Sequence, residues 1–268
     1  MDDPIAGARA FVTGASSGIG AAVAVLLAQE GATVGICARR EDRLAEVLEH
    51  CREYAPDSRM WVFDIGDLSA VPRFAAHVEA EMGRVDLLIN NAGIPKRRRA
   101  RDLSEEDVEE VMRINVLGPI ALVRALLPGM LDRDRGRIVN LSSMGAHSVS
   151  ARVGAYAASK AALELYTEAL HFDLLGTGVD AQLFIPGTTR TEFSLPRDGN
   201  DAPFAPPGGM EPADVAAALV AQLRSGEFEA FGCEEYAQIA AAKRRDTNAF
   251  LAAAAASMTP KPSPEFGE

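Results

Sequence analysis

Along most of the chain, short runs of apolar residues alternate with longer stretches whose apolar residues recur every three or four positions. The short runs predict strands over Ala8–Val12, Thr33–Ala38, Met60–Phe63, Val85–Asn90, Gly136–Ser142 and Val179–Ile185, with a weaker seventh at Glu229–Phe231. The periodic stretches predict helices over Gly18–Glu30, Arg40–Tyr54, Ser69–Met82, Ser104–Val116, Pro119–Leu131, Ala155–Leu175 and Pro212–Arg224. Strands that alternate with helices indicate βαβ units, and therefore a Rossmann-type, doubly wound parallel α/β sheet of about seven strands flanked by helices.

Residues 192–210 interrupt this alternation, because prolines and glycines recur too often for a regular element. Long loops of this kind inside compact domains are typical of lids and binding loops. The segment also carries Phe193, Leu195, Phe204 and Met210, which supply apolar surface. We therefore expect a lid over an apolar substrate pocket, and the alternative is a surface insertion without a role.

Residues 233–268 form a C-terminal extension that is rich in alanine. A helix is expected over Ala252–Ala256, and the prolines that follow Thr259 forbid its continuation. The last eight or so residues are therefore expected to be disordered. No linker rich in proline, glycine or serine divides the chain, so residues 1–268 are expected to form one domain.

Composition excludes several classes of protein. The formal net charge of −11 over 268 residues lacks the basic footprint of a nucleic-acid-binding protein. Cys37, Cys51 and Cys233 have no paired spacing, and the four histidines are dispersed, so we expect neither disulfides nor a metal site. The N-terminus lacks the regions of a signal peptide, and no stretch approaches the ~18 apolar residues that span a bilayer. A cytoplasmic protein without a membrane span is expected.

A glycine-rich turn follows the first predicted strand, with the sequence Thr13-Gly14-Ala15-Ser16-Ser17-Gly18-Ile19-Gly20. Gly14 permits the tight bend, Gly18 lets the backbone approach a phosphate, and Gly20 lets the helix pack on the sheet. The N-terminus of that helix then directs N–H groups at a pyrophosphate. A strand before the turn and an apolar helix after it favour a dinucleotide site over a turn without a ligand.

Tyr156 and Lys160 lie four residues apart on one predicted helix, so they share a face. A phenol has a pKa of ~10, too high for ready proton exchange near neutrality. A neighbouring ammonium favours the phenolate, so we expect Lys160 to lower the pKa of Tyr156 and make it a proton donor. Such a pair also occurs on ordinary exposed helices, but together with a phosphate-binding turn it predicts a nicotinamide oxidoreductase.

Further motifs follow in a recognisable order, and they are listed here in chain order: Asn90-Asn91-Ala92-Gly93, Asn115, Ser142-Ser143, Tyr156-x-x-x-Lys160 and Pro186-Gly187-x-x-x-Thr191. With the T-G-x-x-x-G-I-G turn, they make residues 8 to 232 resemble the short-chain dehydrogenase/reductase family. The resemblance implies an enzyme that interconverts a ketone and a secondary alcohol with a nicotinamide cofactor.

The resemblance also implies roles for single residues. The catalytic set is Asn115, Ser143, Tyr156 and Lys160. In the family, the serine holds the substrate oxygen, the lysine also binds the nicotinamide ribose, and the asparagine anchors a water that links the lysine to solvent; Ser142 is a second candidate for the serine. The expected cofactor-binding residues are Gly14, Ser16, Ser17, Gly18, Ile19, Gly20, Arg39, Arg40, Asp64, Ile65, Asn91, Ala92, Gly93, Tyr156, Lys160, Pro186, Gly187, Thr188 and Thr191.

The end of the second predicted strand indicates which cofactor is used. An NAD enzyme usually places an acid there, whereas this chain has Ala38-Arg39-Arg40 and no acid until Glu41. A guanidinium at this place would pair with the additional phosphate of NADP, so NADP is favoured over NAD. In the alternative interpretation, the arginines are only solvated residues at a helix start. By resemblance, Asp64 bonds the adenine amine, and Thr191 or Thr188 bonds the carboxamide.

Two features leave alternatives open. The basic run Lys96-Arg97-Arg98-Arg99, with Arg101, is favoured as a solvated loop, and it could instead attract an acidic substrate or carrier. His147 is favoured as a simple loop histidine, and it could instead border the substrate pocket.

The leading hypothesis is an NADP-dependent oxidoreductase for a bulky, hydrophobic ketone or secondary alcohol. One alternative is an acyl-carrier or acyl-CoA ketoreductase, which the residues after the seventh strand disfavour because such enzymes usually end there. Another is a cofactor-sensing regulatory protein, which the presence of both Tyr156 and Lys160 disfavours. Helices over Ser104–Leu131 and Ala155–Leu175 resemble the dimerising pair of the family, so a homodimer or homotetramer is expected.

Overall fold

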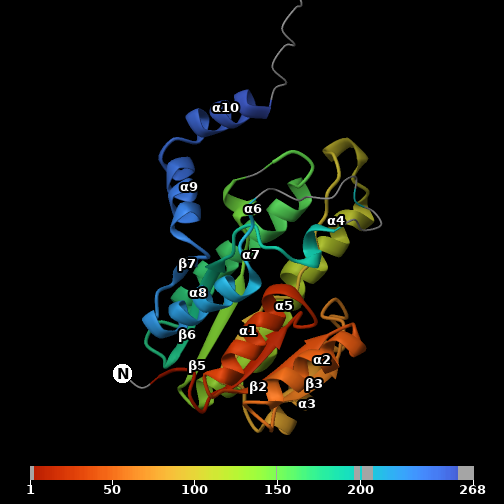
Figure 1. Cartoon of the computed structure of the whole chain (residues 1–268), viewed down its shortest axis with the longest axis vertical. Helices are drawn as coiled ribbons and strands as arrows, with labels where there is room; N and C mark the ends of the chain where they lie inside the picture. Colours follow the sequence, from red (N-terminus) through yellow and green to blue (C-terminus); the bar gives the residue numbers. More distant parts are fainter. Residues whose placement is uncertain (1–2, 149, 196–199, 201–207, 259–268) are drawn as a thin grey trace, which may run out of the picture.

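The computed structural model describes residues 3–148, 150–195, 200 and 208–258. Its centre is a parallel sheet of seven strands in the order β3-β2-β1-β4-β5-β6-β7 (Figure 1). The strands are β1 (Arg9–Thr13), β2 (Thr33–Ala38), β3 (Arg59–Val62), β4 (Leu87–Asn90), β5 (Gly136–Leu141), β6 (Val179–Ile185) and β7 (Glu229–Phe231). The predicted fold class is confirmed. The strand order reverses between β1 and β4, and ligands of such sheets bind outside the carboxyl ends of the strands at this point.

Two layers of helices cover the sheet. The helices predicted from periodicity are α1 (Gly18–Gln29), α2 (Glu41–Arg52), α3 (Val71–Met82), α4 (Glu105–Met112), α5 (Gly118–Asp132), α7 (Gly154–Asp173) and α8 (Pro212–Ser225). On one face, α1, α2 and α8 bury Leu27, Leu44 and Leu219. On the other, α3, α5 and α7 bury a second apolar cluster that includes Leu122 and Leu126. These two cores fix the sheet and the loops that leave its carboxyl edge.

α4 and α5 form one continuous helical run instead of the two separate helices that the sequence predicts. A π-helical turn, η2 (Arg113–Leu117), joins them, and the Gly118 N–H donates to the carbonyl five residues back, on Arg113. Pro119 has no N–H to donate to the carbonyl of Asn115, which favours such a wide turn. The turn places Asn115 in the interior, where it is fully buried.

The joined run Glu105–Asp132 is long and apolar enough, by length and composition, to cross a membrane. The expectation that no stretch would reach that length is therefore wrong. Half of its most apolar window is buried inside the fold, where α5 packs against α3 and β5. A core helix passes the same test of length and composition, so this run is weak evidence for a span.

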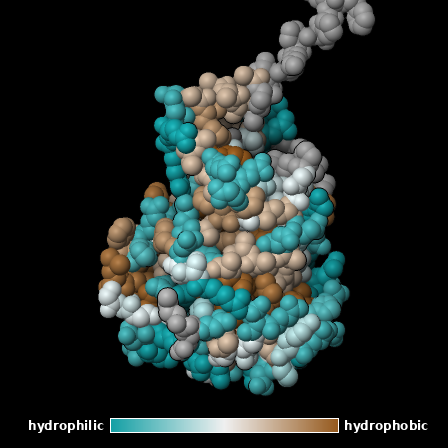
Figure 2. Space-filling model, turned by 60° about the vertical axis from the view of Figure 1, so that its left-hand side comes forward, coloured by the Kyte–Doolittle hydropathy of each residue, from teal (hydrophilic) through white to brown (hydrophobic). Residues whose placement is uncertain are grey.

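Several elements were not predicted from the sequence: α6 (Met144–His147), α9 (Glu234–Arg245) and the short 3-10 turns η1 (Ala100–Asp102) and η3 (Glu192–Ser194). The predicted helix near Ala252 is the centre of a longer one, α10 (Thr247–Met258). α10 packs against α9 and projects from the top of the molecule in Figures 1 and 2. The expected disordered tail and most of the expected lid lie outside the described residues.

Candidate active site

A cavity of about 570 Å³ opens at the carboxyl edge of the sheet, where the strand order reverses. Residues that follow β1 to β6 line it, together with residues of α7 and α9. Every residue predicted for the cofactor or for catalysis lines this cavity except Gly20 and Asn115. The structure therefore brings together positions that are far apart in the sequence.

The glycine-rich turn adopts the backbone conformation that its residues allow. Gly14 has φ 67° and Gly18 has φ 59°, which side-chain-bearing residues rarely adopt. A Cβ on Gly14 would lie 2.7 Å from Ala92 Cα, and one on Gly20 would overlap Asn91 Nδ2. The turn can therefore pack directly against the end of β4. This packing leaves the N-terminus of α1 at the cavity, where its N–H groups favour an anion.

Asn91 braces this turn from the neighbouring strand. Its Nδ2 donates to the carbonyls of Thr13 (2.9 Å) and Gly14 (3.2 Å). In return, Thr13 Oγ1 accepts from the backbone N–H groups of Asn91 (3.1 Å) and Ala92 (3.0 Å). Asn91 was predicted only as a cofactor ligand, and the structure adds that it holds the glycine-rich turn in place.

Ser143 and Tyr156 meet beside Gly145. Ser143 Oγ accepts from the Gly145 N–H at 3.0 Å, and a Cβ on Gly145 would lie 3.1 Å from Tyr156 Cε1. Ser142, by contrast, donates its hydroxyl proton to Glu164 Oε1. The structure therefore favours Ser143 over Ser142 as the hydroxyl that faces the phenol.

Burial has the largest effect on the pKa of both predicted catalytic side chains, Tyr156 and Lys160. Burial lowers the pKa of Lys160 to about 8, against an opposing effect of Glu164. Burial raises the pKa of Tyr156 to about 12, although a hydrogen bond with Ser143 and the charge of Arg97 act to lower it. The expected lowering of the phenol pKa by Lys160 is therefore wrong for this structure. The Lys160 ammonium donates to the Leu141 carbonyl at 2.8 Å, and desolvation of the phenolate outweighs the charges around it.

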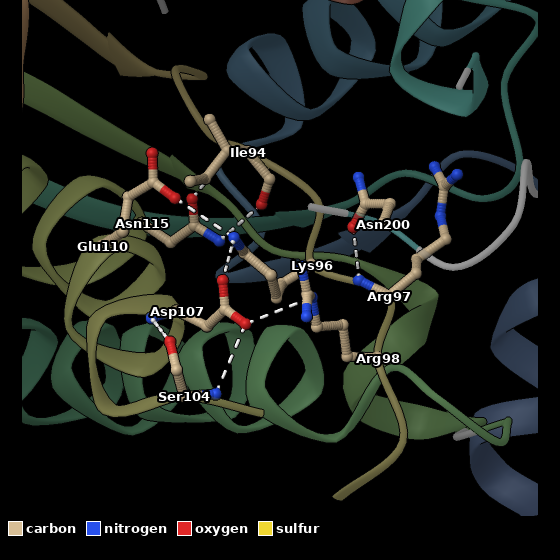
Figure 3. Close-up of polar contacts among 9 residues, drawn as sticks. All are labelled: Ile94, Lys96, Arg97, Arg98, Ser104, Asp107, Glu110, Asn115 and Asn200. Carbon is tan, nitrogen blue, oxygen red and sulfur yellow. Dashed lines mark hydrogen bonds and ion pairs between the residues drawn. The ribbon is translucent and has the colours of Figure 1, made fainter. Parts of the chain in front are cut away.

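Asn115 lies behind Lys160 and outside the cavity. Its side chain accepts from the Ile94 N–H (2.8 Å) and donates to the Ile94 carbonyl (3.1 Å) and to Ser159 Oγ (3.0 Å). Figure 3 shows the contacts between Asn115 and Ile94. A Cβ on Gly93 would lie 3.2 Å from Asn115 Oδ1 and 3.5 Å from Lys160 Nζ. Asn115 and Lys160 therefore converge on the same glycine.

The two arginines after β2 have different surroundings. Arg39 pairs weakly with Asp64 at 3.8 Å, and both side chains are about half exposed. Arg40 donates to Ser16 Oγ (3.1 Å) and Ser17 Oγ (2.6 Å). It also forms an ion pair of 2.6 Å with Glu192, a cavity residue that the sequence reasoning did not single out. Both guanidinium groups thus lie at the rim of the cavity.

The loop after β6 is supported by the C-terminal extension. The Thr188 N–H donates to Tyr236 Oη at 3.1 Å, and the Tyr236 ring occupies the space that a Cβ on Gly187 would need. Tyr236 and Ile239 of α9 also line the cavity. The acidic first turn and basic last turn of α9 are typical of a helix and could have predicted it. No sequence signal indicated where that helix would pack.

The basic run after β4 is not a solvated loop throughout, because Lys96 and Arg97 are buried. Lys96 forms ion pairs with Asp107 (2.8 Å) and Glu110 (3.2 Å), and Arg98 pairs with Asp107 at 3.2 Å (Figure 3). These pairs attach the loop to α4, whose N-terminus is capped by the hydroxyl of Ser104. The favoured interpretation is therefore wrong for these positions.

Arg97 points from this loop towards the segment that follows β6. Its guanidinium donates to the carbonyls of Phe193 (2.6 Å) and Ser194 (3.4 Å), and its backbone N–H donates to Asn200 Oδ1 (2.6 Å). Figure 3 shows the contact with Asn200. The Phe193 ring in turn lies 5.7 Å from the ring of Tyr156, centroid to centroid. Arg97 therefore links two loops that flank the phenol.

His147 is neither a loop histidine nor a residue of the cavity wall. It ends α6, is buried, and its Nε2 lies 3.0 Å from Glu164 Oε1. Its ring contacts that of Phe231 at the end of β7. Among the described residues, no group of three or more His, Cys, Asp or Glu could hold a metal ion.

Comparison with known proteins agrees with this geometry. The sequence profile described as short chain dehydrogenase matches residues 8–200. The chain belongs to the short-chain dehydrogenase/reductase family. It is therefore an oxidoreductase.

Individual relatives extend the likeness beyond the matched region. A short chain dehydrogenase of Pseudocercospora fijiensis is 35% identical over 81% of this chain and 76% of its own length. A fatty acyl-CoA reductase of Acinetobacter baylyi is 34% identical over 72% of this chain, which spans 66% of that relative. Among solved structures, a family member from Burkholderia phymatum in complex with NAD has a TM-score of 0.83 at 25% identity, over 93% of this chain and 96% of the other. One from Sphingobium yanoikuyae in complex with NADPH has a TM-score of 0.77 at 25% identity, over 96% and 98%.

Proposed function

We propose that this protein is an NADP-dependent oxidoreductase that interconverts a hydrophobic ketone and its secondary alcohol. The observation that carries the proposal is the meeting of Ser143, Tyr156 and Lys160 with the glycine-rich turn around a single cavity. A phosphate-binding turn without a proton donor would suit a sensor, and a proton donor without the turn would lack a source of hydride. The combination supports catalysis over cofactor sensing.

In the proposed reaction, a bound nicotinamide supplies the hydride to the carbonyl carbon. Ser143 and Tyr156 hold the carbonyl oxygen by donating hydrogen bonds, and Tyr156 gives its proton to the alkoxide that forms. The Lys160 ammonium, which donates to the Leu141 carbonyl, is assigned to the nicotinamide ribose. Asn115, which lies with Lys160 beside Gly93, is assigned to anchor a water that links Lys160 to solvent.

Residues of this chain support NADP over NAD. Arg39 and Arg40 follow β2 at the cavity rim, and the first acid after that strand is Glu41, at the start of α2. A guanidinium pairs well with a phosphate, whereas a carboxylate would repel it. We assign the adenine to Asp64 and Ile65, the pyrophosphate to the glycine-rich turn, and the carboxamide to Thr191 or Thr188. Known relatives bind either cofactor, so the choice depends on these side chains.

The surroundings of Tyr156 support an apolar substrate. Phe193 lies against its ring, and the apolar side chains of Met144, Val153 and Ile239 line the same cavity. An acyl-CoA or acyl-carrier substrate is a second candidate, favoured by the likeness to a fatty acyl-CoA reductase. This acyl substrate is the weaker candidate. Lys96 of the basic run forms ion pairs with Asp107 and Glu110, so its charge does not contribute to a docking surface for an acidic carrier.

We further propose that the chain forms one domain and assembles as a homodimer or homotetramer in the cytoplasm. Large apolar side chains are exposed on the two predicted dimerising helices: Val108, Leu117, Leu131, Leu165, Phe172 and Leu175. Phe172 alone is 69% exposed. Apolar groups that gather on neighbouring helices are typical of an interface.

The test is the consumption of NADPH with a panel of aryl and long-chain alkyl ketones. The proposal predicts turnover of several apolar ketones and slower turnover of small charged ones. Turnover by the wild type that is absent from Tyr156→Phe would assign the reaction to this site. Failure of every ketone with a folded protein that binds NADPH would contradict the proposal.

A further inference from the structure

The carboxylate of Glu192 lies in a set of groups that would suit a phosphate. Arg40 Nη1 lies 2.6 Å from Glu192 Oε2, and Arg43 Nη2 lies 3.6 Å from Glu192 Oε1. Arg40 is itself held by the hydroxyls of Ser16 and Ser17. Two guanidinium groups and two hydroxyls at the end of a glycine-rich turn are the groups that bind phosphate in proteins.

The groups come from three different segments that meet at the cavity. Ser16 and Ser17 belong to the turn after β1, Arg40 follows β2, and Glu192 starts η3 after β6. All four line the cavity. The ion pair between Arg40 and Glu192 therefore connects the segment after β2 with the loop after β6. That loop also contacts the glycine-rich turn, since a Cβ on Gly18 would lie 2.9 Å from Thr191 Cγ2.

We propose that Glu192 is an internal competitor of the cofactor phosphate for Arg40, and that it thereby limits the affinity for NADP. This inference rests on the proposed NADP-dependent function. The carboxylate takes the place of an anion while the site is open, and a bound phosphate must displace it from Arg40. Glu192 then limits how tightly the site holds a cofactor, in opposition to the arginines that attract it.

The charge of Glu192 makes competition the expected effect. A hydrogen bond from Arg40 and the charges of Arg40 and Arg43 hold the pKa of Glu192 below its usual range, so it stays ionised near neutrality. A carboxylate beside a phosphate repels it, and Arg40 cannot serve both anions with full strength. A neutral amide at position 192 keeps the size of the side chain and removes the repulsion.

The experiment compares Glu192→Gln with the wild type by calorimetric titration of NADPH, and Glu211→Gln serves as the matched control. Glu211 forms an ion pair of the same 2.6 Å length with Arg190, close to the same loop, and does not line the cavity. Because both partners of the Glu192 pair are partly exposed, we expect Glu192→Gln to tighten NADPH about three- to tenfold. The control is expected to match the wild type.

Adenosine 2′,5′-bisphosphate and ADP, titrated in the same way, show which phosphate competes. Tighter binding of the bisphosphate alone places the competition at the 2′-phosphate, and equal tightening of both places it at the 5′-phosphates; either supports the inference. Unchanged or weaker NADPH binding in a folded Glu192→Gln protein overturns it. The preference of the wild type for NADPH over NADH is measured separately, so a failure of the proposed cofactor is distinguishable from a failure of the competition.

Discussion

The proposed cofactor side of the cavity is built mainly from turns that follow β1, β2, β3 and β4, whereas the proposed substrate side is built mainly from segments that follow β5, β6 and β7. On the first side, Thr13, Gly14 and Asn91 lock neighbouring strand ends together through backbone and side-chain hydrogen bonds. On the second, Tyr236 and Arg97 reach across from distant elements to hold the loop after β6. The first side depends on the sheet itself, and the second on how later segments pack against it.

This difference predicts which substitutions disturb the whole site and which disturb only one side of it. A change in a strand-end turn is transmitted to the sheet, because a Cβ on Gly14 would meet backbone atoms of Ala92. A substitution in α9 or in the loop after β6 contacts side chains, which can move to accommodate it. Chemistry is therefore expected to fail with changes near the sheet edge, and substrate range is expected to vary with changes in the later segments.

The largest effect is expected at the junction of the two sides. Tyr156→Phe keeps the ring and its contact with Phe193 but removes the proton donor, so turnover should fall ~10²–10⁴-fold with NADPH affinity nearly unchanged. Steady-state rates and calorimetric binding measure the two effects. Tyr54→Phe, at an exposed position, is the control. Activity within a few-fold of the wild type would exclude Tyr156 from the chemistry.

Lys160 makes the stability of the site depend on pH. Its pKa is lowered to about 8 in the folded protein and returns to its ordinary value on unfolding. Between those two pH values the unfolded chain holds the proton that the folded protein has released, so the free energy of unfolding rises with pH in this window. Relative to Lys160→Met, the wild type should gain on the order of 2 kcal/mol from pH 8 to pH 10. Denaturant titrations that show the same pH slope for both proteins would contradict the burial of this ammonium.

A cofactor switch tests the first side alone. Ala38→Asp together with Arg39→Ala adds a carboxylate for the ribose hydroxyls and removes a partner of the phosphate. The preference for NADPH over NADH should fall about ten- to a hundredfold or reverse, while the rate with a saturating cofactor stays close to that of the wild type. Equal affinities for both cofactors in the wild type would show that the arginines do not select.

The smallest effect is expected on the second side. Tyr236→Phe keeps the ring against Gly187 and removes the acceptor of the Thr188 N–H. Leaving that donor without its partner should cost about 1 kcal/mol, seen as a rise of about fivefold in KM for NADPH or ketone with a smaller change in kcat. An unchanged KM for both would show that α9 does not position the loop after β6.

The contrast between locally built and distantly packed parts of the cavity also explains which site residues could be predicted from the sequence. The glycine-rich turn, Tyr156, Lys160 and Ser143 were identified because each has a fixed local spacing, and the structure places them around one cavity. Glu192 and Tyr236 were not identified, because their roles come from contacts with residues more than forty positions away.

Burial caused the remaining differences between expectation and structure. Lys96 lies in a charged run that looks solvated, but Asp107 and Glu110 compensate its charge inside the fold. The pKa of Tyr156 also depends on desolvation, which no spacing of residues reveals. The π-helical turn at Asn115 was also not predicted, because Pro119 is compatible with such a turn but does not require one.

The transfer of deuterium from NADPH labelled at C4 to a hydrophobic ketone tests the account most directly. The wild type should yield an alcohol that carries deuterium on the former carbonyl carbon, in one enantiomer, and Tyr156→Phe should yield almost none. An alcohol without deuterium, or no alcohol from any ketone of the panel while NADPH is bound, would contradict hydride transfer in this cavity.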